Sequence, residues 1–286
     1  MTLGRARERA CTLGSVSVAP PDRIEFRTDE RGGVTVLRDG HPQSYVDLDD
    51  PGLLAFEYVQ HFALVLDALP AGPLAITHIG GAGLTLPRYV QHTRPGSPQI
   101  VLEPDAALTE AVRREAPLPR GHRIRVRTTD GWSGLQQLAA DSADAIVIDA
   151  FDDGRVPGDL VTTGAMARCA EVLKPHGVLL FNIADRPDRA FLRRVLASAT
   201  TAFEELLLIT TTEVLKKKRF GNYVFVASAA PLDVTDLRRA IARADFPTSL
   251  VGPAETAAWA RAAKPVLDPS EDPAPPAQTE GTLRFR

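Results

Sequence analysis

A glycine-rich turn is the feature of this 286-residue sequence that points most directly to chemistry. Residues 80–83 read Gly-Gly-Ala-Gly, follow the apolar run 74–79 and precede a stretch of helical character. Glu103 ends the next apolar run, 99–102, at about the 20-residue separation typical of dinucleotide-binding motifs. Glycine lets the backbone approach a ligand closely, and a carboxylate here can accept hydrogen bonds from both ribose hydroxyls. The pattern predicts a nucleoside-binding half-fold, without saying what chemistry is done with the nucleoside.

Acidic residues follow the other predicted strands at the points where each strand ends. In an open parallel sheet, ligands bind beyond the carboxyl ends of the strands. The residues that successive strand ends place at this edge are Glu103 and Asp105, Asp130 and Gly131, Asp149 and Asp152, and Asn182 and Asp185. Acids on one rim repel each other, so we expect this edge to take a cationic or hydroxyl-rich ligand.

Each of these acids also has an ordinary structural explanation. Glu103 could cap the following helix, Asp130 could be a turn residue before a helix, and Asp153 is typical of solvated surface. Asp149 is different, because it directly follows the apolar residues 145–148. A carboxylate at that depth costs free energy unless it is paired, so we expect Asp149 to be functional.

Other polar residues fit structural roles better. The basic run 216–219 is typical of a solvated turn, although 219–222 could instead fold back over the site. Tyr58 and His61 share one face of a helix predicted over 53–69, where core packing explains them better than substrate contact.

Composition excludes several function classes. The net charge of −3 is too small to indicate nucleic acid as a partner, and 44% hydrophobic with 24% charged residues is typical of a soluble globular protein. Cys11 and Cys169 form no disulfide framework, which fits the reducing cytoplasm, and no Cys/His cluster has the spacing of metal ligands. The longest apolar region, 62–79, is interrupted by Asp67 and two prolines, so we expect no membrane span.

Alternating strands and helices dominate the middle of the chain. Strands are predicted at 75–79, 99–102, 124–127, 145–148, 178–181, 206–212 and 223–227. Helices are predicted at 86–91, 106–115, 134–140, 163–173, 188–203 and, in the tail, 234–243. Pro87 suits a first helical turn, and Asp188 is the predicted cap of its helix. The alternation predicts an α/β fold with a parallel sheet covered on both faces, and the last two strands should form an antiparallel hairpin.

Four segments are expected along the chain. Residues 1–21 are a disordered N-terminal tail, and 22–70 form a small unit of β-hairpin and helix. A Rossmann-like domain spans 71–230. Residues 231–286 hold one helix and a Pro-rich tail, which we expect to be disordered or loosely packed beyond Asp268.

The ordered motifs resemble those of the spermidine synthases, the polyamine aminopropyltransferases. The matching segments are the glycine turn, Glu103-Pro104-Asp105, Asp130-Gly131, Asp149-Ala150-Phe151-Asp152 and, upstream, Leu37-Arg38-Asp39-Gly40 with Gln43. The similarity covers roughly residues 22–230 and is closest to an actinobacterial spermidine synthase-like branch, which the runs at 85–89 and 219–222 also resemble. The resemblance implies a class I methyltransferase fold, in which a parallel sheet is closed by an antiparallel hairpin.

The resemblance also implies an activity. Spermidine synthases transfer an aminopropyl group from decarboxylated S-adenosylmethionine to a diamine, without a metal. Asp149 and Asp152 would then be catalytic, with Asp149 accepting or relaying the amine proton. Adenosyl binding would fall to Gly80, Gly81, Gly83, Glu103, Asp130 and Gly131, and substrate binding to Gln43, Tyr58 and Asp185. The implied partner is a small-molecule amine, with neither nucleic acid nor membrane, and the implied assembly is a homodimer.

Two departures from the family pattern leave other functions open. Gly83 stands where the family has an aspartate that holds the aminopropyl ammonium, and residues 56–61 lack the family's Tyr-x-Glu. Glu57 and Asp185 are the acids that could compensate. A methyltransferase that uses S-adenosylmethionine on a small molecule would need no acid at position 83. A non-catalytic nucleoside-binding protein is the third interpretation.

Overall fold

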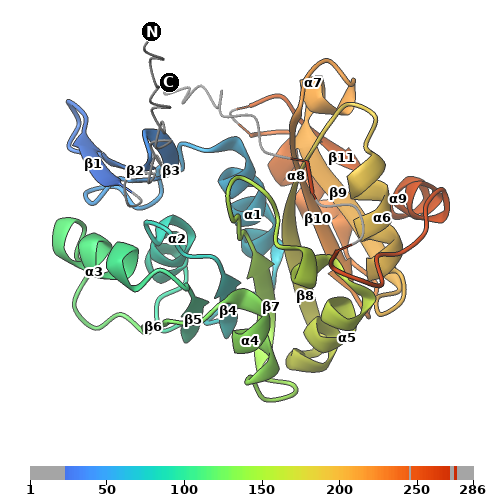
Figure 1. Cartoon of the computed structure of the whole chain (residues 1–286), viewed down its shortest axis with the longest axis horizontal. Coiled ribbons are helices and arrows are strands. Elements are labelled where there is room, and N and C mark those ends of the chain that lie inside the picture. The colour runs from blue at the N-terminus through green and yellow to red at the C-terminus, as the bar shows by residue number, and fades with distance from the viewer. Residues whose placement is uncertain (1–22, 245, 271–273, 276–286) are drawn as a thin grey trace, which may run out of the picture.

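The computed structural model describes residues 23–244, 246–270 and 274–275. This part of the chain is an α/β fold built on one eight-stranded sheet, with a separate three-stranded sheet at its N-terminal end (Figure 1). The disordered tail expected at 1–21 lies outside the described residues. In the described segments, no helix combines the length and apolarity needed to cross a lipid bilayer.

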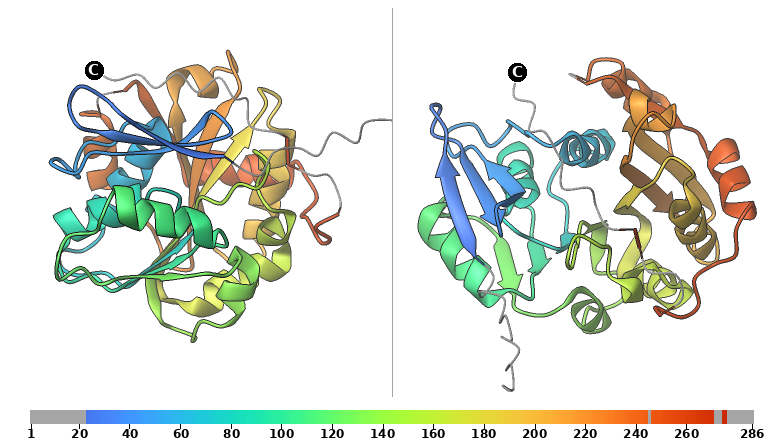
Figure 2. Two further views of the ribbon diagram at one scale, coloured as in Figure 1. Left: turned by 60° about the vertical axis from the view of Figure 1, so that its left-hand side comes forward. Right: turned by 45° about the horizontal axis from the view of Figure 1, so that its top comes forward.

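The first three strands form the small antiparallel sheet. They are β1 (Ile24–Thr28), β2 (Val34–Arg38) and β3 (His41–Val46). Asp29 organises the turn between β1 and β2, because its carboxylate accepts two backbone N–H groups of that turn and the Tyr45 hydroxyl. Val36 packs against α3 (Ala106–Glu115), so the small sheet lies beside α3 at one end of the molecule (Figure 2).

The large sheet runs in the order β11-β9-β10-β8-β7-β4-β5-β6. Its strands are β4 (Ile76–Ile79), β5 (Gln99–Leu102), β6 (Ile124–Arg127), β7 (Ala143–Ile148), β8 (Leu173–Asp185), β9 (Glu205–Thr211), β10 (Gly221–Ser228) and β11 (Thr248–Val251). The five strands from β8 to β6 are parallel, and β10, β9 and β11 continue the sheet in antiparallel pairs. The predicted parallel sheet closed by an antiparallel hairpin is therefore confirmed.

Helices cover both faces of this sheet (Figure 1). The helices besides α3 are α1 (Glu57–Ala68), α2 (Thr85–Thr93), α4 (Gly131–Gln136), α5 (Thr163–Val172), α6 (Ala190–Ala199), α7 (Thr212–Leu215), α8 (Val234–Ile241) and α9 (Pro253–Arg261). One core cluster joins α4, α5, α6 and α9 to the sheet, and another joins α1, α2 and α8 to it. Burial on both faces explains why the central strands read as continuous apolar runs.

Several helices begin at other residues than predicted, among them α1 and α4. α1 begins at Glu57 rather than near 53, and its N-cap residue Phe56 makes no side-chain capping hydrogen bond. α4 begins at Gly131 rather than 134, because Asp130 caps it through an Oδ1 that accepts the Ser133 N–H at 2.8 Å.

The N-cap residue of α6 is Arg189 rather than the predicted Asp188. Arg189 has a left-handed backbone with a φ of 60°, so α6 begins only at Ala190. Asp188 accepts the Ala190 N–H at 3.2 Å. The first turn of α6 is instead held by Asp185, whose Oδ2 accepts the Leu192 N–H at 2.7 Å.

The C-terminal segment packs more tightly than predicted. β11 adds an edge strand beside β9, and α9 packs against α6; neither element had been predicted. Val266 and Ala274 are 1% and 2% exposed and belong to the main core. The expectation of a loose tail is therefore wrong at Ala274, while 271–273 and 276–286 lie outside the described residues.

Candidate active site

A cavity of about 720 Å³ opens at the carboxyl ends of β4, β5 and β7. Its walls come from the glycine turn, these strand ends, the small sheet and the first turns of α1 and α2. The charged and polar side chains that line it are Arg38, Gln43, Ser44, Tyr58, His78, Thr85, Glu103, Asp105, Asp130, Asp149, Asp152 and Asp159. The cavity lies at the edge of the sheet where the sequence predicts ligand binding.

The turn after β4 requires glycine at position 80. Gly80 has a φ of 91°, and a Cβ there would lie 2.3 Å from the Asp149 carbonyl oxygen. A side chain would therefore push the turn away from β7. The N–H groups of Gly81 and Ala82 both donate to Glu103, whose Oε2 accepts them at 2.9 and 3.1 Å. Glu103 thus fixes the shape of the turn.

Glu103 is buried and keeps a free acceptor position. Its Oε1 accepts the Asp105 N–H at 3.1 Å, so three hydrogen bonds are in use, whereas a carboxylate offers about four acceptor positions. The helix-cap explanation for Glu103 is wrong, because Asp105 caps α3 through an Oδ1 that accepts the Leu108 N–H at 2.8 Å. Asp105 is also paired with Arg38 of β2. A ribose hydroxyl can still bind Oε1, and this role for Glu103 stays a prediction.

Gly83 does not line the cavity. Its N–H donates to Ser44 Oγ on β3 at 2.9 Å, and a Cβ at Gly83 would lie 2.3 Å from that oxygen. Thr85 Oγ1 donates to the Tyr45 carbonyl at 2.8 Å, so β3 is fastened to the turn at two points. Ser44 Oγ therefore occupies the space into which a side chain at position 83 would extend. The cofactor-binding role of Gly83 stays a prediction, which its position outside the cavity wall does not support.

Asp149 lies between two hydrogen-bond donors at the end of β7. Asn182 of β8 donates its Nδ2–H to Oδ1 at 3.0 Å, and Tyr58 of α1 donates its hydroxyl to the same carboxyl group. Burial raises the pKa of Asp149 to about 6, against the lowering effect of these two bonds. A carboxyl group with such a pKa can exchange a proton with a ligand near neutral pH. Tyr58, which core packing seemed to explain, is part of the cavity wall.

Three further acids line the same cavity. Asp130 is exposed and caps α4, and its neighbour Gly131 also faces the cavity. Asp152 is exposed in the loop after β7. Asp159 was missed by the sequence analysis, because it lies in a single turn of 3-10 helix that no apolar periodicity marks. Burial and the nearby Asp130 carboxylate raise the pKa of Asp159. Within the described segments, no three His, Cys, Asp or Glu side chains are grouped as a metal ion would require.

Asp185 is a structural residue, so its predicted role in substrate binding is wrong. It is 2% exposed, and its Oδ1 and Oδ2 accept the N–H groups of Arg186 and Leu192, both at 2.7 Å. Both oxygens therefore hold the chain that enters α6. Gln43, by contrast, lines the cavity, where its Nε2 donates to the His41 carbonyl at 3.3 Å.

His61, Glu57 and Arg219 lie close to the site without lining it. His61 is buried, as its predicted role in core packing requires, and its Nε2 lies 3.3 Å from Thr248 Oγ1. Burial lowers the pKa of His61 to about 4. Glu57 pairs with Arg219 at 3.1 Å. The segment 219–222 therefore reaches the start of α1 but does not enter the cavity. Glu57 is engaged by this ion pair, and Asp185 by backbone amides, and neither lines the cavity.

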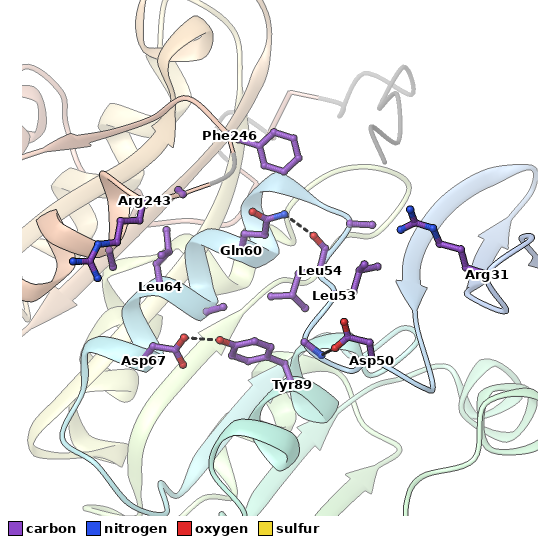
Figure 3. Close-up of a pocket in the computed structure, with 15 residues that line it drawn as sticks. Arg31, Asp50, Leu53, Leu54, Gln60, Leu64, Asp67, Tyr89, Arg243 and Phe246 are labelled. Atoms are coloured by element: carbon purple, nitrogen blue, oxygen red, sulfur yellow. Dashed lines mark hydrogen bonds between the residues drawn. The ribbon is translucent and has the colours of Figure 1, made fainter. Parts of the chain in front are cut away.

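A second cavity, of about 610 Å³, lies between α1, α2, α8 and the segment 50–55 (Figure 3). Its polar side chains are largely bonded to other wall groups: Tyr89 donates to Asp67, and Gln60 Nε2 donates to the Leu54 carbonyl at 2.6 Å. None of its lining residues follows a parallel strand of the large sheet. We therefore assign the ligand site to the first cavity.

Known proteins resemble this chain in sequence and in fold. No protein-family model matches it. The polyamine aminopropyltransferase of Chromobacterium violaceum is 27% identical over 180 residues, which are 60% of this chain and 67% of that protein. A probable spermidine synthase from Corynebacterium glutamicum superposes with a TM-score of 0.80 and 26% identity, covering 86% of this chain and 92% of that chain. Human methyltransferase-like protein 13 in complex with SAH gives a TM-score of 0.55 at 22% identity, covering 65% and 89%.

The fold, with a cavity at the carboxyl ends of the parallel strands, defines a Rossmann-like protein of the class I methyltransferase type, as predicted. The relatives narrow this class. In sequence and in fold, the chain is similar to polyamine aminopropyltransferases and spermidine synthases, and the Corynebacterium neighbour agrees with the actinobacterial branch that the motifs indicate.

Proposed function

We propose that this protein transfers an aminopropyl group from decarboxylated S-adenosylmethionine to a small amine. The observation that carries the proposal is Asp149, a buried carboxyl group with a pKa of about 6 beside the glycine turn. The name of the Chromobacterium relative, a polyamine aminopropyltransferase, supports the same reaction.

The charge of the cavity favours a donor without a carboxylate. Six acids line it: Glu103, Asp105, Asp130, Asp149, Asp152 and Asp159. Arg38 is the sole arginine or lysine among the described lining residues, and it is paired with Asp105. Intact S-adenosylmethionine would bring a carboxylate that these acids repel, whereas the decarboxylated donor and a polyamine bring only cationic groups.

The adenosyl part of the donor fits the glycine turn. Gly80 and Gly81 let it approach the backbone, and Glu103 keeps an acceptor position for a ribose hydroxyl. Asp130 and Gly131 line the same cavity after the third parallel strand, where we propose that the adenine lies. That methyltransferase-like protein 13 binds SAH in the same fold supports an adenosyl ligand.

The proposed transfer is a single displacement. The neutral amine nitrogen attacks the methylene carbon next to the sulfonium; a C–N bond forms as the C–S bond breaks, and its electron pair leaves with sulfur as methylthioadenosine. Because an alkyl amine has a pKa of roughly 10, it arrives protonated, and Asp149 accepts the proton and passes it to water. Asp152 would hold the far ammonium of the acceptor. Alignment of the two substrates supplies the remaining acceleration.

Calorimetry with three ligands tests the proposed donor. Decarboxylated S-adenosylmethionine and methylthioadenosine should each bind at least about tenfold more tightly than S-adenosylmethionine, a difference of about 1.4 kcal/mol. Tighter binding of S-adenosylmethionine would overturn the proposal in favour of methyl transfer, which the glycine at position 83 would permit. Binding of all nucleosides with no turnover would identify a non-catalytic nucleoside-binding protein.

We also propose a cytoplasmic location and a homodimer. Cys169 is a free, buried thiol, which supports a reducing compartment. β1 is an edge strand of the small sheet and can pair with another chain. Sedimentation velocity over a range of concentrations would measure the assembly, and a monomer at all concentrations would refute the dimer.

A further inference from the structure

Asn182 is a buried amide placed beside Asp149 by the register of the sheet. Phe181 of β8 is the partner of Ile148 of β7, so the next residues of the two parallel strands, Asn182 and Asp149, are neighbours. Asn182 is 1% exposed, and its Nδ2 donates to Asp149 Oδ1 at 3.0 Å. The amide therefore contacts the proposed proton acceptor directly, from beneath the cavity.

The other end of this amide is unused. Asn182 Oδ1 is buried, and none of the described residues donates a hydrogen bond to it. Buried polar groups are almost always paired, because an unpaired one loses its hydrogen bonds to water without replacement. The unpaired oxygen would be explained if the site has a second conformation in which Asn182 Oδ1 accepts a hydrogen bond.

We propose that Asn182 is a positioning residue whose amide serves Asp149 in both of its protonation states. The proposal rests on the proposed function, in which Asp149 takes a proton from the amine. While Asp149 is a carboxylate, it needs a donor, and Nδ2–H supplies one. Once Asp149 is a carboxylic acid, its hydroxyl needs an acceptor, and a half-turn of the amide about its Cβ–Cγ bond brings Oδ1 into place. A side chain with only donors or only acceptors would suit one state alone.

The role of Asn182 follows from the surroundings of Asp149. Burial favours the neutral acid, and the hydrogen bonds from Asn182 and Tyr58 are the opposing effects on its pKa. The other titratable groups that face the cavity are His78, Arg38 and the acids Glu103, Asp105, Asp130, Asp152 and Asp159. Burial lowers the pKa of His78, on β4, to about 4. Without the Asn182 donor, the pKa of Asp149 would be higher still, and a smaller fraction of Asp149 would be ionised and able to accept a proton at neutral pH.

Carbon-13 NMR of aspartate-labelled protein tests the inference independently of turnover, with Asp149→Asn assigning the signal. We expect Asp149 to titrate near pH 6 in the wild type, and at least about one pH unit higher in Asn182→Leu. Asn182→Asp, which keeps the shape, should give a coupled pair with one apparent pKa above 7. The matched control is Ser228→Ala, a 1% exposed polar residue of β10 that pairs with Val178 of β8, four residues before Asn182, and it should leave the titration unchanged.

The side-chain amide of Asn182 reports the second half of the inference. Its nitrogen-15 and proton signals should shift with the same midpoint as Asp149, because the amide exchanges its donor for its acceptor there. An Asp149 midpoint that is unchanged in both Asn182 variants, or amide signals that stay constant through it, would overturn the inference. If the NMR shifts appear but no aminopropyl transfer is found, the proposed function fails and the inference about proton affinity stands.

Discussion

Replacing Gly83 with aspartate, the residue of the resembled family, should destabilise this protein rather than restore a substrate contact. A Cβ at Gly83 would lie 2.3 Å from Ser44 Oγ and 3.2 Å from a methyl carbon of Val46. The same serine oxygen accepts the Gly83 N–H at 2.9 Å, and it would have to move. Overpacking costs about 1–3 kcal/mol and a lost hydrogen bond about 0.5–1.5 kcal/mol. We therefore expect the free energy of unfolding to fall by about 2–4 kcal/mol.

Urea unfolding followed by circular dichroism measures this loss through the transition midpoint. Ser44→Gly removes the oxygen that the new side chain would meet. In a double-mutant cycle, Gly83→Asp should therefore cost at least about 1 kcal/mol less in the Ser44→Gly background than in the wild type. A Gly83→Asp variant as stable as the wild type, or a cycle without coupling, would show that Ser44 does not close this position.

Four further predictions concern the site and the tail. Asp149→Asn should abolish transfer while changing donor affinity by no more than about threefold, or about 0.7 kcal/mol, and any retained turnover would remove Asp149 from the mechanism. Above pH 6, the same variant should be more stable than the wild type by up to about 3 kcal/mol, because the pKa of Asp149 is raised from 3.8 to about 6 in the folded state and ionised Asp149 therefore destabilises the fold. Thermal unfolding should show this gain in stability vanish below about pH 4, where Asp149 is protonated in both the folded and the unfolded state. Glu103→Gln should weaken methylthioadenosine binding at least about tenfold, since the Glu103 carboxylate accepts two N–H groups of the turn, and an unchanged calorimetric affinity would refute this role. Gly158→Ala should loosen the tail and speed hydrogen exchange there, because its Cβ would lie 2.6 Å from the Pro269 carbonyl oxygen. Gly164→Ala should not, because its Cβ would lie 3.8 Å from Thr162 Oγ1, an ordinary contact distance.

The strand-end residues could be predicted because their signal is local. Apolar runs mark the parallel strands, and the residue after each run must lie at the carboxyl edge of the sheet. Glu103, Asp130 and Asp149 were found in this way, and all three line the cavity. The same reasoning could not separate Asp185 from them, because its two oxygens are taken by backbone amides of a helix start whose geometry the sequence does not reveal.

Contacts between distant segments account for what the sequence could not show. Ser44 lies 39 residues before Gly83, so no local pattern says that it fills the space beside the turn. Tyr58 reads as one more apolar-face residue of α1, yet it reaches Asp149 from a different element. β11 has only four residues and no alternation, and it forms because β9 offers an open edge.

Mass spectrometry of the reaction products tests the central claim, aminopropyl transfer that depends on Asp149, most directly. The wild-type protein is incubated with decarboxylated S-adenosylmethionine and a panel of diamines, beside Asp149→Asn and a sample with S-adenosylmethionine as donor. We expect methylthioadenosine and an aminopropylated amine to appear in equal amounts with the wild type and the decarboxylated donor, and neither product with Asp149→Asn. A methylated amine formed from S-adenosylmethionine, with no transfer from the decarboxylated donor, would contradict the account.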